Sequence, residues 1–425
     1  MKTPAEQALS AAYADARGKL PGLPDLREQA FKRFEARGLP HRRVEEWKYT
    51  DLRALMREMP PLAGAPDAKA KARAKEAGLL AGLDARRIVF VEGAFVPELS
   101  DLTPEPGLTI GSLAQALASG EPRVTQHVGK VFPTDDVAVA LNTALMGDGA
   151  VIHVAASTQI ARPIHLVFTG SDTPAAAFVR SLIVVEKGAR VTLIEDHDSG
   201  AVQVNAALEL VAADESQVDY FKLTQANALH IASLLASVGA RARFNTFAFT
   251  RNSALVRNQS FIRFAGEHTE SAIRGVSLLK GKEHVDTTLL IEHAKGHCQS
   301  REQFKTVLDD ESHGVFQGKI VVQPHAQKTD AKMLTRALLL SEEAEADNKP
   351  ELEIFADDVV CGHGATAGAL DPGLKFYLMS RGISDAEAEA LLIQAFIGET
   401  VEEIAHEGIR EALMNAALEW LRGRG

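Results

Sequence analysis

Residues that favour tight turns recur at a nearly regular interval through the middle of the chain, and this recurrence constrains the fold more than any other feature. Most steps between them are about 12 to 15 residues, enough for a strand of roughly eight residues and a turn. One interval is doubled. Evenly spaced strands indicate a β-sandwich, a β-barrel or a β-solenoid, and the spacing does not choose among them. The turn residues are Gly188, Gly200, Asp214, Gly239, Asn252, Gly266, Gly281, Gly296 and Asp310.

The side-chain pattern between these turns is that of β-strands. From Val204 to Leu210, apolar residues alternate with Gln203, Asn205 and Glu209, as in a half-buried strand. Other stretches have no clean phase, and residues 218–223 place polar and small side chains on both faces. This mixture favours long stacked strands over a Greek-key core.

The N-terminal part of the chain shows helical patterns and one short β segment. An apolar stripe with helical spacing runs through residues 9–16, and residues 110–146 have a similar pattern. Residues 88–91 are all apolar and precede a glycine, which predicts a short strand. Residues 60–82 are rich in Ala, Lys and Arg, so we expect a mobile, solvated connection there.

Helical patterns return at the C-terminus. Ser384 and Glu387 have the spacing of a capping box, so a helix is expected to begin there. Gly398 predicts its end, and Thr400 with Glu403 predicts the start of a last helix. Three regions follow: a largely helical domain with a short β segment at 1–146, a β core at 147–366 and a helical domain at 367–425.

The composition argues against several classes of protein. The 425 residues include 46 Lys+Arg against 57 Asp+Glu, a net charge of −11, so the chain lacks the positive field that binds nucleic acid. Two cysteines are too few for a disulfide-built secreted scaffold. No apolar run approaches the ~18 residues of a membrane span, and the first residues lack the apolar core of a signal peptide. We expect a cytoplasmic protein that contacts no membrane.

Sequence motifs for nucleotide and acyl chemistry are absent. There is no P-loop, no dinucleotide-binding glycine pattern and no nucleophile elbow. We therefore expect a chain that binds no nucleotide itself and is not an enzyme. Two acidic pairs, Asp309-Asp310 and Asp357-Asp358, are interpreted as a solvated turn and a strand end, because adjacent strand residues point to opposite faces. The alternative function is a β-helix carbohydrate-active enzyme, a lyase or esterase.

Two clusters contain side chains that bind metals. His293, His297 and Cys298 could ligate zinc or iron, and a zinc-dependent hydrolase is a third possibility, although their spacing matches no standard zinc motif. The second cluster contains Cys361 and His363. These residues are two apart, so on a strand both would point to the same face.

The number of cysteines limits what such a site can hold. An iron–sulfur cluster usually takes four thiolates, or thiolates together with histidines. The chain has only Cys298 and Cys361. One copy therefore cannot supply four thiolates, and any cluster would take ligands from histidine, from a second chain or from both.

A long run around Cys361 has a further implication. Residues 347–366 read DNKPELEIFADDVVCGHGAT, and related segments lie at 296–301, 315–318 and 376–383, with RVEEWKYT at 43–50. Together they resemble the signature of the SufB/SufD family, the scaffold proteins of the SUF iron–sulfur cluster assembly system. The Cys-x-His-Gly-Ala-Thr form and the scarcity of cysteine resemble the SufD type, although Gly362 stands where Ser is more usual.

The resemblance implies a right-handed parallel β-helix core flanked by N- and C-terminal helical domains. It implies a SufB partner bound through the β-helix, a SufC ATPase bound through the C-terminal helices, and a homodimer when the chain is isolated. It also implies a transient nascent iron–sulfur cluster shared with SufB at the junction of the two chains. Cys361 and His363 would face that junction as ligands, and Cys298 is a further candidate metal ligand.

Overall fold

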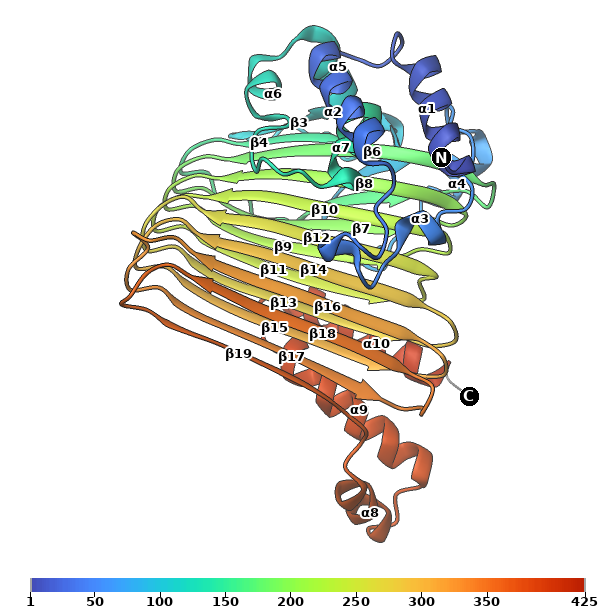
Figure 1. Cartoon of the computed structure of the whole chain (residues 1–425), viewed down its shortest axis with the longest axis vertical. Coiled ribbons are helices and arrows are strands. Elements are labelled where there is room, and N and C mark those ends of the chain that lie inside the picture. The colour runs from blue at the N-terminus through green and yellow to red at the C-terminus, as the bar shows by residue number, and fades with distance from the viewer. Residues whose placement is uncertain (1, 424–425) are drawn as a thin grey trace.

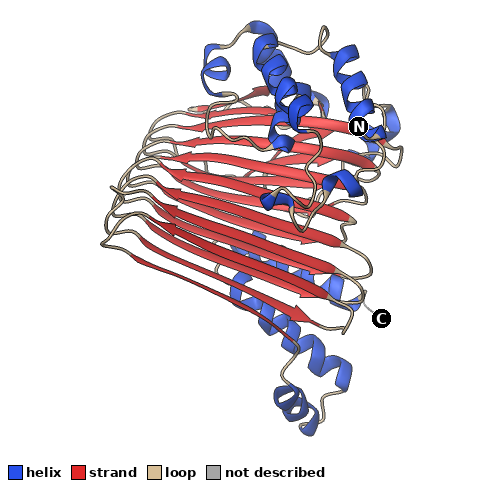
Figure 2. Cartoon of the chain, viewed as in Figure 1, coloured by secondary structure: helices blue, strands red, loops and turns tan. Residues whose placement is uncertain are grey.

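The computed structural model describes residues 2–423, and a coil of stacked β-strands forms its centre (Figure 1). Even-numbered strands from β4 to β18 are neighbours in one sheet, and odd-numbered strands from β5 to β19 in the other. Neighbours within each series are parallel, so each turn of the chain adds one strand to each sheet. The parallel β-helix that the resemblance implies is therefore confirmed. Helices gather near its two ends (Figure 2).

The strands lengthen from the N-terminal end into the β-helix. Their bounds are β1 (Arg86–Val91), β2 (Ala94–Phe95), β3 (Leu108–Ser112), β4 (Ala150–Val154), β5 (Ile164–Thr169), β6 (Ala175–Val185), β7 (Arg190–Asp198), β8 (Val202–Ala212), β9 (Gln217–Gln225), β10 (Leu229–Val238), β11 (Arg243–Arg251), β12 (Leu255–Phe264), β13 (Glu270–Leu279), β14 (His284–His293), β15 (Gln299–Leu308), β16 (His313–Val322), β17 (Asp330–Leu339), β18 (Glu345–Ile354) and β19 (Val360–Gly368).

The helices lie before β4 and after β19. They are α1 (Pro4–Ala16), α2 (Pro24–Arg37), α3 (Leu52–Leu55), α4 (Ala68–Ala74), α5 (Leu113–Ser119), α6 (Pro122–His127), α7 (Val137–Leu145), α8 (Pro372–Ser380), α9 (Asp385–Val401) and α10 (Glu407–Arg422), with 3₁₀ turns at η1 (Glu45–Trp47) and η2 (Pro97–Leu99). None of the helices within residues 2–423 is long and apolar enough to cross a bilayer.

The predicted turns lie at the corners of the β-helix, and close stacking explains some of their glycines, whereas Gly188 and Gly281 have a positive φ and no close neighbour. A Cβ added at Gly266 would lie 2.0 Å from the backbone nitrogen of Ala240 in the preceding turn. The doubled interval between Asp214 and Gly239 contains one more corner, after β9, which has no glycine. The even-to-odd corners from β8 to β17 place non-glycine residues in the left-handed conformation, at φ of 62, 53, 59, 60 and 63° for Glu215, Arg241, His268, His297 and Lys328, whereas the corner before β7 has Gly188 there, at φ 68°.

Apolar packing occurs both inside the β-helix and on the outer face of each sheet. The interior is filled by side chains from both sheets, including Phe244, Phe264 and Ile320. Helices α9 and α10 cover the outer face of the odd-numbered sheet. Helices α1, α2 and α7 contribute to an apolar cluster on the outer face of the even-numbered sheet. These helices therefore bury apolar side chains on the outer face of each sheet, which would otherwise face water.

The solvated connection predicted for residues 60–82 is wrong. Asp67 caps α4 by accepting a hydrogen bond from the Ala70 backbone, and Ala70 and Ala74 are buried against Val89 and Val91 of β1. The small alanine side chains suit this close contact. A segment with little apolar bulk therefore packs because two of its alanines face the sheet, while Lys69, Arg73 and Lys75 face water.

Candidate metal-ligand site at the end of the β-helix

The β-helix ends in two strands that each have one free edge. Within residues 2–423, β18 and β19 are the outermost strands of their sheets (Figure 1). Each therefore presents backbone N–H and C=O groups that no further strand of this chain pairs with. Cys361 and His363 lie on β19, so they occupy the last turn of the structure.

The register of β19 gives the direction of both side chains. Cys361 pairs with Ala331 of β17, and His363 pairs with Met333. Ala331 and Met333 are buried in the inner core of the β-helix. Cys361 and His363 therefore lie on the inner face of β19, as the two-residue spacing predicts. Cys361 is half-buried against that core, whereas His363 is exposed.

The surroundings of Cys361 favour the neutral thiol. Burial raises the pKa of Cys361, and the nearby carboxylates of Asp330 and Glu302 act in the same direction. A thiolate rather than a thiol binds metal, so a cation arriving at this sulfur displaces a proton.

An acidic side chain, that of Glu302, lies two strands further into the β-helix on the same inner face as His363. Glu302 of β15 pairs with Met333, which in turn pairs with His363. Its side chain is enclosed, and burial raises its pKa to about 8, against the opposing effect of the Ser300 hydroxyl. At neutral pH, Glu302 is therefore largely a neutral carboxylic acid inside the β-helix.

The glycine between the two candidate ligands lies in open space. A Cβ added at Gly362 would meet no atom within 4 Å, whereas one at Gly364 would lie 3.3 Å from Leu334. Nothing in the described chain requires a glycine at 362. The backbone there is open to approach by another molecule.

The structure does not bring the other predicted cluster together as a metal site. His293 is buried and its ring shares a hydrogen bond with Ser300, at 3.0 Å from Nε2 to Oγ. His297 is exposed and stacks on His268. The thiol of Cys298 is fully buried and donates to the Gly266 carbonyl oxygen at 3.3 Å. These three residues do not form a close ligand group within residues 2–423. Metal binding by Cys298 remains a prediction that the proposed site does not use.

The first acidic pair lies in a turn, as predicted, whereas the second lies in a corner and does not end a strand as predicted. Asp309 and Asp310 follow β15, and Asp357 and Asp358 lie between β18 and β19. Asp358 forms an ion pair with Lys328 of the neighbouring corner. These acids occupy corners of the β-helix, and the alternative of a carbohydrate-active enzyme gains no paired acid and base from them.

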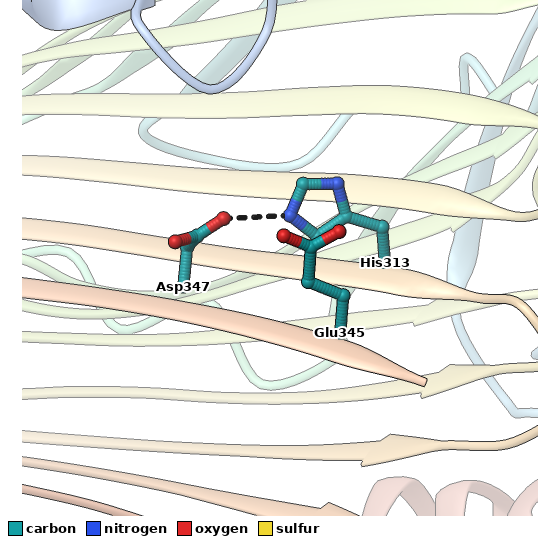
Figure 3. A group of neighbouring side chains, drawn as sticks. All are labelled: His313, Glu345 and Asp347. Atoms are coloured by element: carbon teal, nitrogen blue, oxygen red, sulfur yellow. Dashed lines mark hydrogen bonds and ion pairs between the residues drawn. The ribbon is translucent and has the colours of Figure 1, made fainter. Parts of the chain in front are cut away.

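A ligand group that sequence reasoning missed lies on the outer face of the even-numbered sheet. His313 begins β16, and Glu345 and Asp347 lie at the start of β18 (Figure 3). One ligand atom of each lies within 4.8 Å of the others. The pairing of His313 with Glu345 across 32 positions brings them together, and that register is not visible in the sequence.

The end of the molecule that contains β19 also exposes apolar side chains. At the last turn these are Ile354, Phe355 and Val360, with exposed fractions of 41, 60 and 62%. Within residues 2–423, only three large hydrophobic side chains outside residues 354–391 are exposed to a similar degree. Exposed apolar groups concentrated in this way are typical of surfaces that bind another protein. The other exposed large hydrophobic residues between positions 354 and 391 are Leu374, Phe376, Tyr377, Met379 and Leu391.

Comparison with known proteins identifies the family to which the chain belongs. Residues 167–396 match the family model described as SUF system FeS cluster assembly, SufBD core domain, and residues 12–166 match the SufBD protein N-terminal region. The chain is 32% identical to the iron-sulfur cluster assembly protein SufD of Escherichia coli, over 91% of this chain and 90% of that protein.

Two further relatives extend the comparison. An iron-sulfur cluster assembly SufBD family protein of Synechocystis is 32% identical, over 86% of this chain and 84% of that protein. The SufD protein of Bacillus subtilis is 26% identical, over 92% of both chains. Family models that together span residues 12–396, and relatives matched over most of their length, show that this chain belongs to the SufBD family of iron–sulfur cluster assembly proteins.

Proposed function

We propose that this chain is a non-catalytic scaffold subunit of the SUF complex, which pairs with SufB and contributes ligands to a nascent iron–sulfur cluster between the two chains. The observation that carries this proposal is the position of Cys361 and His363. Both lie on the inner face of the last strand, at an end of the β-helix where no further turn covers them.

The free edges of β18 and β19 support pairing with a second β-helix. A strand that lacks a neighbour can extend its sheet with a strand of another chain. Exposed apolar side chains at Phe355 and Val360 would be buried by the same contact. A SufB chain that pairs there extends both sheets and places its own ligands opposite Cys361. When no SufB is present, a second copy of this chain would occupy the same edges.

The scarcity of thiols supports a shared cluster. Of the two cysteines, Cys298 is fully buried, so Cys361 is the one thiol near the surface. Four ligands for a cluster cannot then come from Cys361 and His363 alone. The remaining ligands would come from SufB, and iron and sulfide would enter at the open junction as the cargo of the complex.

The C-terminal helices are the proposed attachment for the SufC ATPase. Helix α8 exposes Leu374, Phe376 and Tyr377, and the next helix, α9, packs on the odd-numbered sheet. The chain has no P-loop of its own, so ATP would bind to SufC. Movement of α8 and α9 on ATP binding would strain the β-helix and open the junction with SufB.

Substitution of the two candidate ligands in the intact complex tests this function. We expect Cys361→Ala and His363→Ala each to abolish cluster assembly in cells that depend on the complex, while the variant chains still co-purify with SufB and SufC. His325→Ala is the matched control, because His325 is an exposed imidazole in a turn. Normal cluster assembly with both ligand variants would show that the site is wrongly assigned.

A further inference from the structure

Three side chains on the outside of the even-numbered sheet converge as metal ligands do. The Nε2 atom of His313 lies 2.9 Å from Oδ2 of Asp347, and the Glu345 carboxylate lies beside the same ring (Figure 3). All three lie on one face of the sheet, because His313 pairs with Glu345 and Asp347 lies two residues further along β18. That face is the outer one, since Phe316 and Ile320 of β16 point into the inner core. One nitrogen and two carboxylate oxygens therefore face a common point.

Lysine and arginine side chains of the described residues do not neutralise the two carboxylates. Within residues 2–423, neither Glu345 nor Asp347 forms an ion pair with Lys or Arg. Lys349, the next outward residue on β18, pairs with Glu45 and Glu351 instead. Two like charges held this close repel each other, and a cation between them would remove that repulsion.

The surrounding residues hold the group in place and leave it reachable. The ring of His284 packs edge-on against His313, with centroids 4.7 Å apart, and its Nε2 shares a hydrogen bond with Thr50. Arg257 forms an ion pair with Asp286, so it does not neutralise Glu345 or Asp347. The side chains of His313 and Asp347 are 23 and 29% exposed, so an ion can enter from solvent.

We propose that His313, Glu345 and Asp347 bind one divalent first-row transition-metal ion, with water completing its coordination. A set of one imidazole and two carboxylates suits zinc, iron(II) or manganese(II), whereas Mg²⁺ prefers oxygen ligands alone. Because Nε2 of His313 must be unprotonated to bind the ion, the ion would replace its hydrogen bond to Asp347. The ion would join β16 to β18, the edge strand of the sheet.

This site is separate from the proposed cluster ligands. Cys361 and His363 lie on the inner face of the odd-numbered sheet, and His313 lies on the outer face of the even-numbered sheet. Metal binding by His313, Glu345 and Asp347 can therefore be tested in the full chain carrying Cys361→Ser and His363→Gln. These two substitutions remove metal binding at the open end. Failure of the test leaves the proposed role in cluster assembly unaffected.

The test is titration of this metal-stripped protein with Zn²⁺ by calorimetry and with Co²⁺ by visible absorption. We expect one ion per chain, and at least about a tenfold loss of affinity with His313→Gln, Glu345→Gln or Asp347→Asn. The change at Asp347 keeps the side chain's size, so circular dichroism should show an intact fold. His325→Gln, at an exposed imidazole, should change nothing.

Two results would overturn the proposal. One is undiminished Zn²⁺ affinity in the well-folded His313→Gln and Asp347→Asn variants, which would place the ion elsewhere. The other is displacement of Zn²⁺ by Mg²⁺ at comparable concentration, which would show a diffuse acidic surface without an imidazole ligand. Loss of the cobalt absorption in the His313→Gln single variant, with the His325→Gln control unchanged, would identify His313 as the nitrogen ligand.

Discussion

The two proposed iron ligands, Cys361 and His363, differ in how accessible they are to an arriving ion. Burial raises the pKa of Cys361, so its thiol must give up a proton as the metal arrives. His363 is exposed on the same face of β19 and is the more accessible of the two. We therefore propose that iron contacts His363 first and that Cys361 completes its attachment when sulfide and the SufB ligands are present.

The buried carboxyl of Glu302 gives the fold a pH dependence. Burial raises its pKa from 4.5 to about 8, so the folded chain holds a proton that the unfolded chain releases. Between those two values the folded state binds more protons, and stability falls as pH rises, by at most about 1.4 kcal/mol per pH unit.

Replacement of Glu302 by glutamine tests this dependence. Glutamine mimics the neutral acid, so Glu302→Gln should unfold at the same urea concentration as the natural chain near pH 5 and at a clearly higher one near pH 9. The measurement is the urea midpoint of each protein across that range. Parallel pH profiles for the two proteins would mean that Glu302 does not titrate inside the β-helix.

At the level of elements, the corners of the β-helix depend on how closely successive turns approach. A methyl group at Gly266 would overlap the backbone of Ala240, whereas one at Gly362 would face open space. Gly266→Ala should therefore cost at least about 2 kcal/mol of unfolding free energy. Gly362→Ala is the matched substitution and should leave stability nearly unchanged. Thermal and urea unfolding of both variants measure the difference; equal stability would contradict the stacking seen at the corner.

Local sequence signals predicted the start of α9 but not its end. The capping box of Ser384 and Glu387 is present. Gly398 and Thr400, however, lie inside the helix and are buried, because α9 continues to Val401 and places Ile397 against the odd-numbered sheet. The predicted break is wrong, since packing on the sheet outweighs the helix-ending tendency of one glycine. His406 caps α10 in place of Thr400.

The candidate sites show the same difference between features that depend on local sequence and features that depend on contacts between distant segments. Cys361 and His363 could be placed on one face from their spacing alone, because both belong to one strand. His313, Glu345 and Asp347 could not be grouped in that way, since their meeting depends on the pairing of β16 with β18. Corner lengths vary from turn to turn, so the residues that meet across turns are not a fixed number apart in the sequence.

At the scale of the whole molecule, the β-helix connects two specialised ends. Helices α1, α2 and α7 cover one outer face, and α9 and α10 cover the other. Within residues 2–423 no further strand covers the last turn, and its free strand edges, exposed apolar residues and Cys361 lie together there. In the proposed function, a second chain would complete the ligand set of an iron–sulfur cluster at this end.

Anaerobic reconstitution with iron(II) and sulfide tests this claim most directly. The isolated chain, separated as a monomer by ultracentrifugation, is compared with its complex with SufB by visible absorption and Mössbauer spectroscopy. We expect a protein-bound cluster in the complex, its loss with Cys361→Ser, and none in the monomer. A four-iron cluster ligated wholly by the monomer would contradict a ligand set shared between chains.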